Sequence, residues 1–209
     1  LTGALNIAAL RKSLQEILSR HEAFRMIFRE ARGRPVQFVG PVTQVNLPVI
    51  DLRDLEADKQ AGEFLQLSED DAGLPFDLEA GPPIRFALIR LADYENVLLI
   101  TVHHIVCDDW SMKIFRREFA SLYESFALNK PSRLPEARLQ LVDFVSWQRD
   151  LGRRRLFNDQ LAYWKSQLGK PNARFAFKTP GKKRKKRSFK TATQAFEVDA
   201  NAYRRLLAE

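Results

Sequence analysis

The sequence predicts a protein of the α/β or α+β class, and two kinds of apolar pattern carry this prediction. In some segments apolar residues recur at steps of three and four, which is typical of amphipathic helices. In other segments a short apolar run lies between glycine, proline or polar residues, which is typical of strands. Both patterns are mixed along the 209 residues, so we expect an α/β or α+β class.

The predicted helices are marked by their apolar spacing and by residues suited to cap them. The first begins behind Asn6, a good N-cap residue, and runs from Ile7 to about Arg20. Another begins after Asp108 or Asp109, either of which can cap it, and continues to about residue 126. Further helices are predicted within residues 51–71, 139–151, 157–168 and 201–207.

The predicted strands are short and mostly paired. They cover residues 24–29 and 36–39, 45–50, 84–91 and 97–102, and 193–198. The first two are expected to form a hairpin with a turn at Gly33, and a polar stretch joins the later pair. The sheet is therefore built by segments spread over most of the chain.

The charge of the chain is concentrated in one place. The net charge is +8, but eight basic residues fall within residues 178–190, and without them 26 basic residues stand against 26 acidic ones. The basic run at residues 182–187 has the composition of a nucleic-acid patch or a localisation signal. No aromatic or glycine pattern accompanies it, so we favour a solvated loop and expect no nucleic-acid partner.

Hydropathy and cysteine content bear on the location of the protein and on the kinds of site that it can contain. The sequence has no run approaching roughly 18 apolar residues, which a membrane span needs, and no N-terminal secretion pattern. We therefore expect no membrane partner and a cytoplasmic location. The single cysteine, Cys107, excludes an internal disulfide, and the lack of Cys/His clusters argues against a metal site. Because the chain begins at Leu1, we expect it to be a piece of a longer polypeptide.

Two adjacent histidines, His103 and His104, follow the apolar run 97–102, and Asp108 lies four residues after His104. Successive side chains of an extended segment point to opposite faces, so the two histidines are expected to have different roles. Neutral imidazole is suited to act as a general base near pH 7, since its ordinary pKa is about 6.5. From the spacing alone, polar residues at the margin of a core are slightly favoured over catalysis.

Five motifs follow one another along the chain. They are RHEAFRMIF at residues 20–28, PFDL at 75–78 with GPPIR at 81–85, HHIVCDDWS at 103–111, DFVSWQR at 143–149 and YWK at 163–165. Together they resemble the motifs of condensation domains of nonribosomal peptide synthetases, in which the histidine run is H-H-x-x-x-D-G-W-S. The histidine motif by itself is less specific, because other acyltransferases of the chloramphenicol acetyltransferase fold share it.

This resemblance implies an α/β, chloramphenicol acetyltransferase-like lobe with a mixed sheet flanked by helices. Such a lobe is the first half of a V-shaped domain whose active site lies in a tunnel between two lobes. Residues 1–170 match the N-terminal lobe, and residues 171–209 match a basic loop and the crossover toward a second lobe. The later motifs of the family, which belong to that second lobe, are absent. The isolated fragment is therefore expected to be inactive.

The resemblance also implies an activity, which is amide-bond formation between a donor acyl or peptidyl group and an acceptor aminoacyl group. Both arrive as thioesters on the phosphopantetheine arms of peptidyl carrier proteins, in an assembly line that includes an adenylation domain. No cofactor bound by the chain itself is expected. Trp110 and Ser111 favour the peptide-forming branch of the family over the epimerising one. A coenzyme A-dependent acyltransferase of the same fold and a catalytically idle carrier-docking module stay open as alternatives.

Individual roles follow from the same resemblance. His104 matches the catalytic histidine with His103 as its support, and Asp108 matches an acid that pairs with the arginine here at Arg25. Asp109 stands where the family has glycine. Because aspartate adopts a positive φ less easily than glycine, we expect either a rebuilt loop or a weakened activity, and we favour a functional variant.

Overall fold

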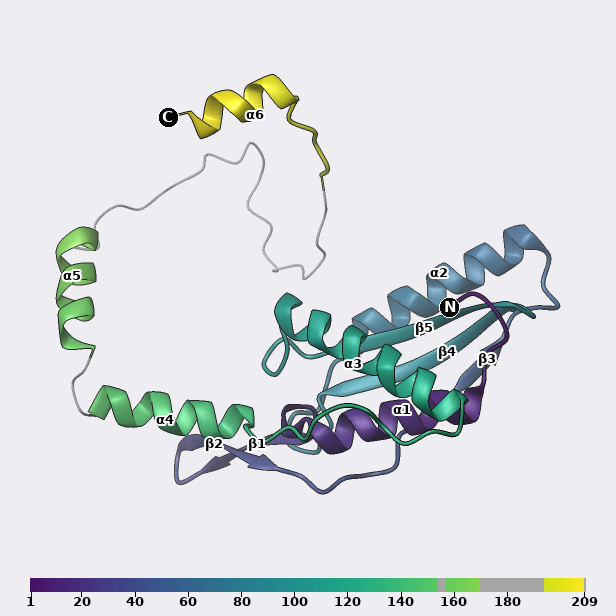
Figure 1. The fold of residues 1–209 in the computed structure, drawn as a ribbon, viewed down its shortest axis with the longest axis horizontal. Helices are drawn as coiled ribbons and strands as arrows, with labels where there is room; N and C mark the ends of the chain where they lie inside the picture. Colours follow the sequence, from purple (N-terminus) through teal and green to yellow (C-terminus); the bar gives the residue numbers. More distant parts are fainter. Residues whose placement is uncertain (154–156, 170–193, 209) are drawn as a thin grey trace. The chain divides into compact units, whose positions relative to one another are not determined.

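The computed structural model describes residues 1–153, 157–169 and 194–208. The α-helices in this part of the chain are α1 (Ile7–Arg20), α2 (Ala57–Gly73), α3 (Asp109–Ala127), α4 (Leu141–Arg153), α5 (Asn158–Leu168) and α6 (Ala200–Leu207). Its strands are β1 (Met26–Ala31), β2 (Arg34–Val39), β3 (Val49–Asp51), β4 (Ile84–Ala92) and β5 (Glu95–Val102) (Figure 1). The chain divides into two compact units, residues 1–158 and 159–209.

The first unit contains a three-stranded mixed sheet with the strand order β3-β4-β5. β3 runs parallel to β4, whereas β4 and β5 pair antiparallel, with Ile84 opposite Val102 and Ala92 opposite Glu95. β1 and β2 form a separate antiparallel hairpin. The predicted mixed sheet is therefore confirmed.

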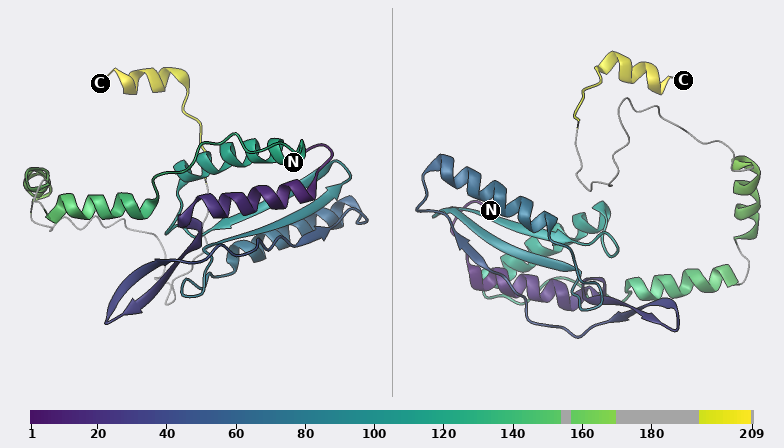
Figure 2. Two further views of the ribbon diagram at one scale, coloured as in Figure 1. Left: turned by 60° about the horizontal axis from the view of Figure 1, so that its bottom comes forward. Right: turned by 180° about the vertical axis from the view of Figure 1, so that it is seen from behind.

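Helices cover both faces of this sheet, with α1 and α3 on one face and α2 on the other (Figures 1 and 2). The main core lies between the sheet and the helices α1 and α3. Its fully or almost fully buried members include Leu10, Leu14 and Ile17 of α1, Ile84, Phe86 and Leu88 of β4, and Phe115 and Leu122 of α3. Because burial of apolar surface contributes roughly 25 cal/mol per Å², this layer is the main source of stability in the first unit.

Both ends of α1 agree with the prediction from sequence. Asn6 Oδ1 accepts a hydrogen bond from the backbone N–H of Ala9 at 3.0 Å, which satisfies one of the donors left free at the start of a helix. At the other end, His21 leaves helical geometry, and its N–H donates to the carbonyl of Ile17 at 3.1 Å. The predicted cap and the predicted last residue, Arg20, are both confirmed.

The β1–β2 hairpin turns through Arg32 and Gly33, which have φ values of 53° and 71°. Two consecutive residues with positive φ are the geometry that joins twisted antiparallel strands most directly, and glycine adopts it without a steric cost. The glycine turn is therefore confirmed. The first strand begins later than predicted, at Met26, because residues 22–25 form a short 3₁₀ turn.

Two other predicted strands differ from the structure. Within residues 45–50, only the last two join β3, since Pro48 has no N–H to donate to a ladder, although its carbonyl accepts from the N–H of Leu88 at 2.9 Å. The strand predicted at residues 193–198 is wrong for 194–198, which form no regular structure and pair with no described strand. Thr193 itself lies outside the described residues.

The second unit contains most of α5 and the whole of α6, close to the bounds predicted from sequence. Asp199 caps α6, because its Oδ1 accepts from the N–H groups of Asn201 and Ala202 at 2.9 and 3.0 Å. The basic run at residues 182–187 lies outside the described residues, and the predicted boundary between residues 170 and 171 stays a prediction. Across the described ranges, no helix combines the length and the apolar character needed to cross a membrane.

Candidate functional site

The histidine pair lies where β5 ends. The strand stops at Val102, and the backbone N–H of His103 donates to the carbonyl of Pro83 at 2.9 Å, which attaches the strand end to the segment leading into β4. The chain then turns, because the N–H of Val106 donates to the carbonyl of His103 at 3.2 Å. The loop is thus fixed to the sheet on one side and leads into α3 on the other.

His103 and His104 have different surroundings, as the alternation of an extended chain predicts. His103 is half-buried, its Nδ1 accepts from the N–H of Ile105 at 3.1 Å, and its ring meets that of Phe76 edge to face with 6.0 Å between centroids. His104 is exposed. An imidazole that accepts at Nδ1 carries its proton on Nε2 when neutral, so His103 is held in one tautomer while His104 is open to a second molecule.

Asp108 is the N-cap of α3. Its Oδ1 accepts from the backbone N–H of Ser111 at 2.8 Å and from the hydroxyl of the same residue at 2.7 Å. These hydrogen bonds lower the pKa of the Asp108 carboxyl below its ordinary value. A carboxylate held ionised in this way is suited to anchoring the loop on the helix, and poorly suited to carrying protons.

The contact between Asp108 and Ser111 was not predicted from the sequence. A usable signal was present, since an N-cap side chain accepts from the backbone N–H two or three residues later, and Ser111 lies three residues after Asp108. The hydroxyl adds a second hydrogen bond that a residue such as alanine lacks. Ser111 is therefore the direct partner of the predicted acid.

Arg25 does not pair with Asp108. Its guanidinium donates to the carbonyls of Leu18 at 2.9 Å, Gly40 at 2.6 Å and Ser19 at 3.5 Å. None of the ion pairs found within the described ranges joins Arg25 to Asp108. The carbonyls at the end of α1 lack intrahelical partners and carry partial negative charge, so they are effective local acceptors for this arginine.

Asp109 is the first residue of α3 and is exposed. In the described part of the chain, Arg32 and Asn129 are the non-glycine residues with positive φ, and Asp109 is not among them. The strain expected from aspartate in a glycine position therefore does not arise in this loop. A carboxylate in the first turn instead interacts favourably with the positive end of the helix dipole.

Cys107 is a buried residue of the same loop. Burial raises the pKa of its thiol, an effect that Ser111 partly offsets and that the carboxylates of Asp108 and Asp109 reinforce. A thiol with a raised pKa stays protonated and is a weak nucleophile. Cys107 thus acts as a small packing residue, in agreement with the interpretation from sequence.

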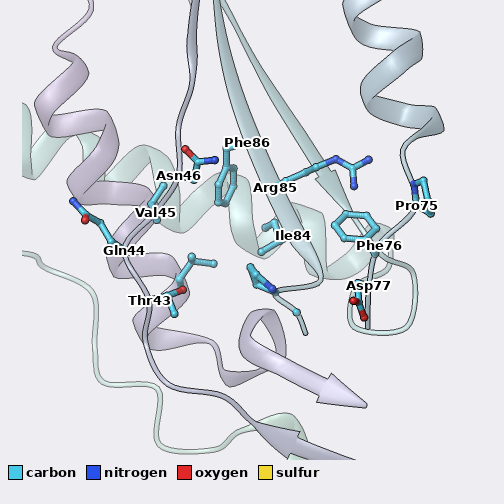
Figure 3. Close-up of a pocket in the computed structure, with 13 residues that line it drawn as sticks. Thr43, Gln44, Val45, Asn46, Pro75, Phe76, Asp77, Ile84, Arg85 and Phe86 are labelled. Atoms are coloured by element: carbon cyan, nitrogen blue, oxygen red, sulfur yellow. The ribbon is translucent and has the colours of Figure 1, made fainter. Parts of the chain in front are cut away.

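Two cavities lie in this part of the first unit, and only the second is lined by residues of the loop and of α3. One, of about 300 Å³, lies beside the start of β4, with Phe76 and Arg85 in its lining (Figure 3). The other, of about 150 Å³, is lined in part by His21, Val106 and Ser111. His104 lines neither cavity, so among the described residues it lies on an open surface.

An ionic cluster lies at the wall of the second cavity. Glu118 Oε2 is 2.8 Å from His21 Nε2 and 3.2 Å from Arg20 Nε. Burial alone raises the pKa of the Glu118 carboxyl, but the hydrogen bonds and charges of His21 and Arg20 outweigh burial and bring this pKa below its ordinary value. Arg20 and His21 begin the first of the five sequence motifs, whereas Glu118 lies outside all of them, and its position beside these two residues was not predicted.

Comparison with known proteins extends over most of the chain. A family model described as the condensation domain matches residues 1–208. Chondramide synthase cmdD of Chondromyces crocatus is 40% identical over 168 residues, which are 80% of this chain and 4% of that protein. Surfactin synthase subunit 2 of Bacillus subtilis (strain 168) is 38% identical over 166 residues, which are 79% of this chain and 4% of that protein. The chain thus spans only a few per cent of the length of these curated relatives.

Solved structures show the same fold. The X-domain from teicoplanin biosynthesis is 30% identical with a TM-score of 0.71, over 81% of this chain and 37% of that chain. The starter condensation domain of rhizomide synthetase RzmA has a TM-score of 0.74 at 18% identity, over 83% of this chain and 41% of that chain. The second likeness bears on the fold alone. Together they confirm the predicted fold class.

Proposed function

The chain belongs to the condensation-domain family of nonribosomal peptide synthetases, and on that premise we propose that it is part of a domain that forms amide bonds. The donor is an acyl or peptidyl thioester and the acceptor an aminoacyl thioester, both on phosphopantetheine arms of carrier proteins. One observation carries the proposal, namely that an exposed His104 follows a His103 held by the backbone and by Phe76.

In the proposed reaction the amine of the acceptor attacks the carbonyl carbon of the donor thioester. A C–N bond forms, the C–S bond breaks, and the donor carrier is left with a thiol. His104 orients the amine, accepts the proton that it loses, and returns that proton to the leaving thiolate. No redox partner is required, since no atom changes its oxidation state.

Positioning contributes more to this reaction than proton removal does. An α-amine with a pKa of about 8 is roughly one-tenth unprotonated at pH 7, and a thioester is already activated. General-base help is typically worth about 10²–10⁴-fold, whereas alignment of two reactants is worth roughly 7–11 kcal/mol. A histidine fixed at a strand end is suited to both tasks.

The neighbours of His104 have supporting roles in this proposal. His103 holds the strand end, and Asp108 anchors the loop on α3 through Ser111. Arg25 acts at a distance, by joining the end of α1 to the end of the β1–β2 hairpin. Asp109 is a functional variant of the family glycine, because it begins the helix without a left-handed backbone.

The proposed partners are two peptidyl carrier proteins and an adenylation domain of the same assembly line. The proposed location is the cytoplasm, where ATP for aminoacyl activation is available. We also propose that the 209 residues alone are inactive, since His104 lies on an open surface of the described residues. Comparing turnover of this fragment with that of the full-length protein tests the last point directly.

The main test replaces His104 with alanine in the full-length protein and measures amide product from carrier-bound donor and acceptor. We expect product formation to fall by about 10²-fold or more. The matched control is Lys59→Ala, an exposed residue of α2, which should leave turnover unchanged. Undiminished turnover in the His104 variant would falsify its assignment.

The choice of donor separates the alternatives. An amide-forming condensation domain uses carrier-bound donors, whereas a coenzyme A-dependent acyltransferase of this fold uses the coenzyme A thioester. A docking module binds carrier proteins and yields no product from either donor. Offering both donors to the full-length protein, with carrier binding measured in parallel, distinguishes all three.

A further inference from the structure

We propose that Phe76 is a positioning residue that holds His103, and thereby the strand end that presents His104. This inference rests on the proposed function, because the histidine that it concerns is the proposed catalytic one. Phe76 lies 27 positions before His103 in the sequence, in the segment between α2 and β4. The structure places its ring in contact with two side chains, those of Arg85 and His103.

The two partners of Phe76 are a cation and an imidazole. The guanidinium carbon of Arg85 lies 4.2 Å from the centroid of the Phe76 ring, and the His103 ring meets Phe76 at 86° with 6.0 Å between centroids. Figure 3 shows Arg85 extending from β4 over Phe76. Perpendicular aromatic pairs and cations over ring faces are both favourable, because the edge of a ring carries partial positive charge and its face partial negative charge. Phe76 therefore links an arginine to His103.

Arg85 is itself fixed. Its Nε donates to Asp71 Oδ1 at 2.9 Å, and its Nη2 donates to the carbonyl of Leu74 at 2.8 Å and to that of Asp71. The hydroxyl of Thr101 donates to the second oxygen of the Asp71 carboxylate. Both members of the ion pair are about four-fifths buried, with 21% and 22% of their side chains exposed. The cation over Phe76 is therefore part of a largely buried, hydrogen-bonded cluster.

The sheet places this cluster on the same side as His103. Arg85 and Thr101 are opposite each other in the β4–β5 pair, and His103 lies two residues after Thr101. Residues two apart along a strand point to the same face. Arg85 and His103 therefore lie on the same face of the sheet, and the ring of Phe76 contacts both of them there.

The segment that carries Phe76 is also anchored. The N–H of Phe28 donates to the carbonyl of Leu78 at 2.8 Å, and the N–H of Gly81 donates to that of Asp77 at 2.8 Å. The support for the His103 ring thus extends from α2 and the hairpin through Phe76. Nδ1 of His103 accepts a hydrogen bond from the backbone N–H of Ile105, and His104 lies between these two residues in the chain. A displaced His103 ring therefore changes the turn that contains His104.

The test uses three variants of the full-length protein. Phe76→Leu removes the ring and keeps an apolar side chain, whereas Phe76→Tyr keeps the ring. Phe119→Leu is the matched control, since Phe119 is a half-buried aromatic residue that stacks on Phe115 and Tyr123, away from His103. Each variant is treated with diethyl pyrocarbonate, which acylates neutral imidazole, and modification of each histidine is followed by mass spectrometry. His21, half-buried against Glu118, is the internal reference.

We expect Phe76→Leu to raise the modification rate of His103 severalfold while the rate of His21 stays unchanged. The same variant should lower kcat by roughly ten- to a hundredfold with little change in KM, because the catalytic histidine is misplaced while substrate binding is kept. Phe76→Tyr should restore both quantities to near the wild-type values. Phe119→Leu should leave the modification rate of His103 unchanged.

Other results overturn the inference. These are a Phe76→Leu variant with wild-type reactivity at His103, a parallel rise at His21, and an equal rise at His103 in Phe119→Leu. A wild-type protein that forms no amide from carrier-bound substrates refutes the proposed function instead. The modification rates need no turnover, so in that case they still decide whether Phe76 positions His103.

Discussion

Glu118 Oε2 on α3 lies 2.8 Å from Nε2 of His21, the residue directly after α1, although 97 positions separate the two in the sequence. Arg20 Nε reaches the same oxygen at 3.2 Å. The contact joins the two helices that cover one face of the sheet. Because Asp108 caps the start of α3, the contact also fixes the helix that follows the histidine loop.

The Glu118 carboxylate is expected to make stability depend on pH. Its ordinary pKa is 4.5 and its pKa in the folded protein is lower, so its contribution is fully present above pH 4.5 and is lost as the pH falls through the folded pKa. Replacement of Glu118 by glutamine should cost about 1–3 kcal/mol at neutral pH. Urea unfolding at neutral pH and in acid should show this difference shrinking in acid.

Glu136→Gln is the control for this measurement, because Glu136 is an exposed acid between α3 and α4. It should change the free energy of unfolding little at either pH. A Glu118→Gln variant whose deficit stays the same in acid would show that the carboxylate charge is not what stabilises the junction of α1 and α3.

Local signals were sufficient to predict much of the fold. The spacing of leucines and the cap at Asn6 predict α1, and the glycine turn predicts the β1–β2 hairpin, because each depends on neighbours in the sequence. The same holds for β4 and β5, whose apolar runs are separated by a short polar connection. The strand predicted at residues 193–198 is wrong over 194–198, since apolar composition alone does not supply a pairing partner.

Contacts across the fold were not predictable in the same way. Nothing local indicates that Glu118 meets His21, or that Phe76 lies between Arg85 and His103, because these pairs depend on how helices and strands pack. The partner of Arg25 was predicted from family resemblance and differs in the structure, since nearby carbonyls compete for the guanidinium. The sequence thus indicates which residues belong to the candidate site, whereas the side chains that contact them are known only from the folded structure.

Asp108 is expected to act through hydrogen bonding more than through its charge. Asp108→Asn keeps an oxygen that can accept from the Ser111 N–H, so it should retain most of the thermal stability and most of the turnover. Asp108→Ala removes the cap and should lower both. Thermal unfolding and turnover of the full-length variants provide the test. If Asn and Ala are equally impaired, the negative charge itself is essential.

Asp109→Gly should not produce a more active enzyme. Asp109 begins α3 without positive φ, so glycine relieves no strain there, while it removes a favourable charge at the helix start and adds backbone freedom. We expect stability to fall by about 0.3–1 kcal/mol and turnover to stay within a few fold of the wild type. A large gain in turnover would mean that the aspartate impairs the loop by a route other than backbone strain.

Arg25 and Asp108 are expected to contribute independently. Arg25 donates to the carbonyls of Leu18, Ser19 and Gly40, whereas Asp108 accepts from Ser111, so the two side chains share no partner. Arg25→Lys should lower the melting temperature, because an ammonium cannot reproduce the planar set of donors. A double-mutant cycle with Asp108→Asn should give melting-temperature changes that add within experimental error. A clear departure from additivity would show that the two groups do pair, in the full-length protein, as the sequence resemblance implies.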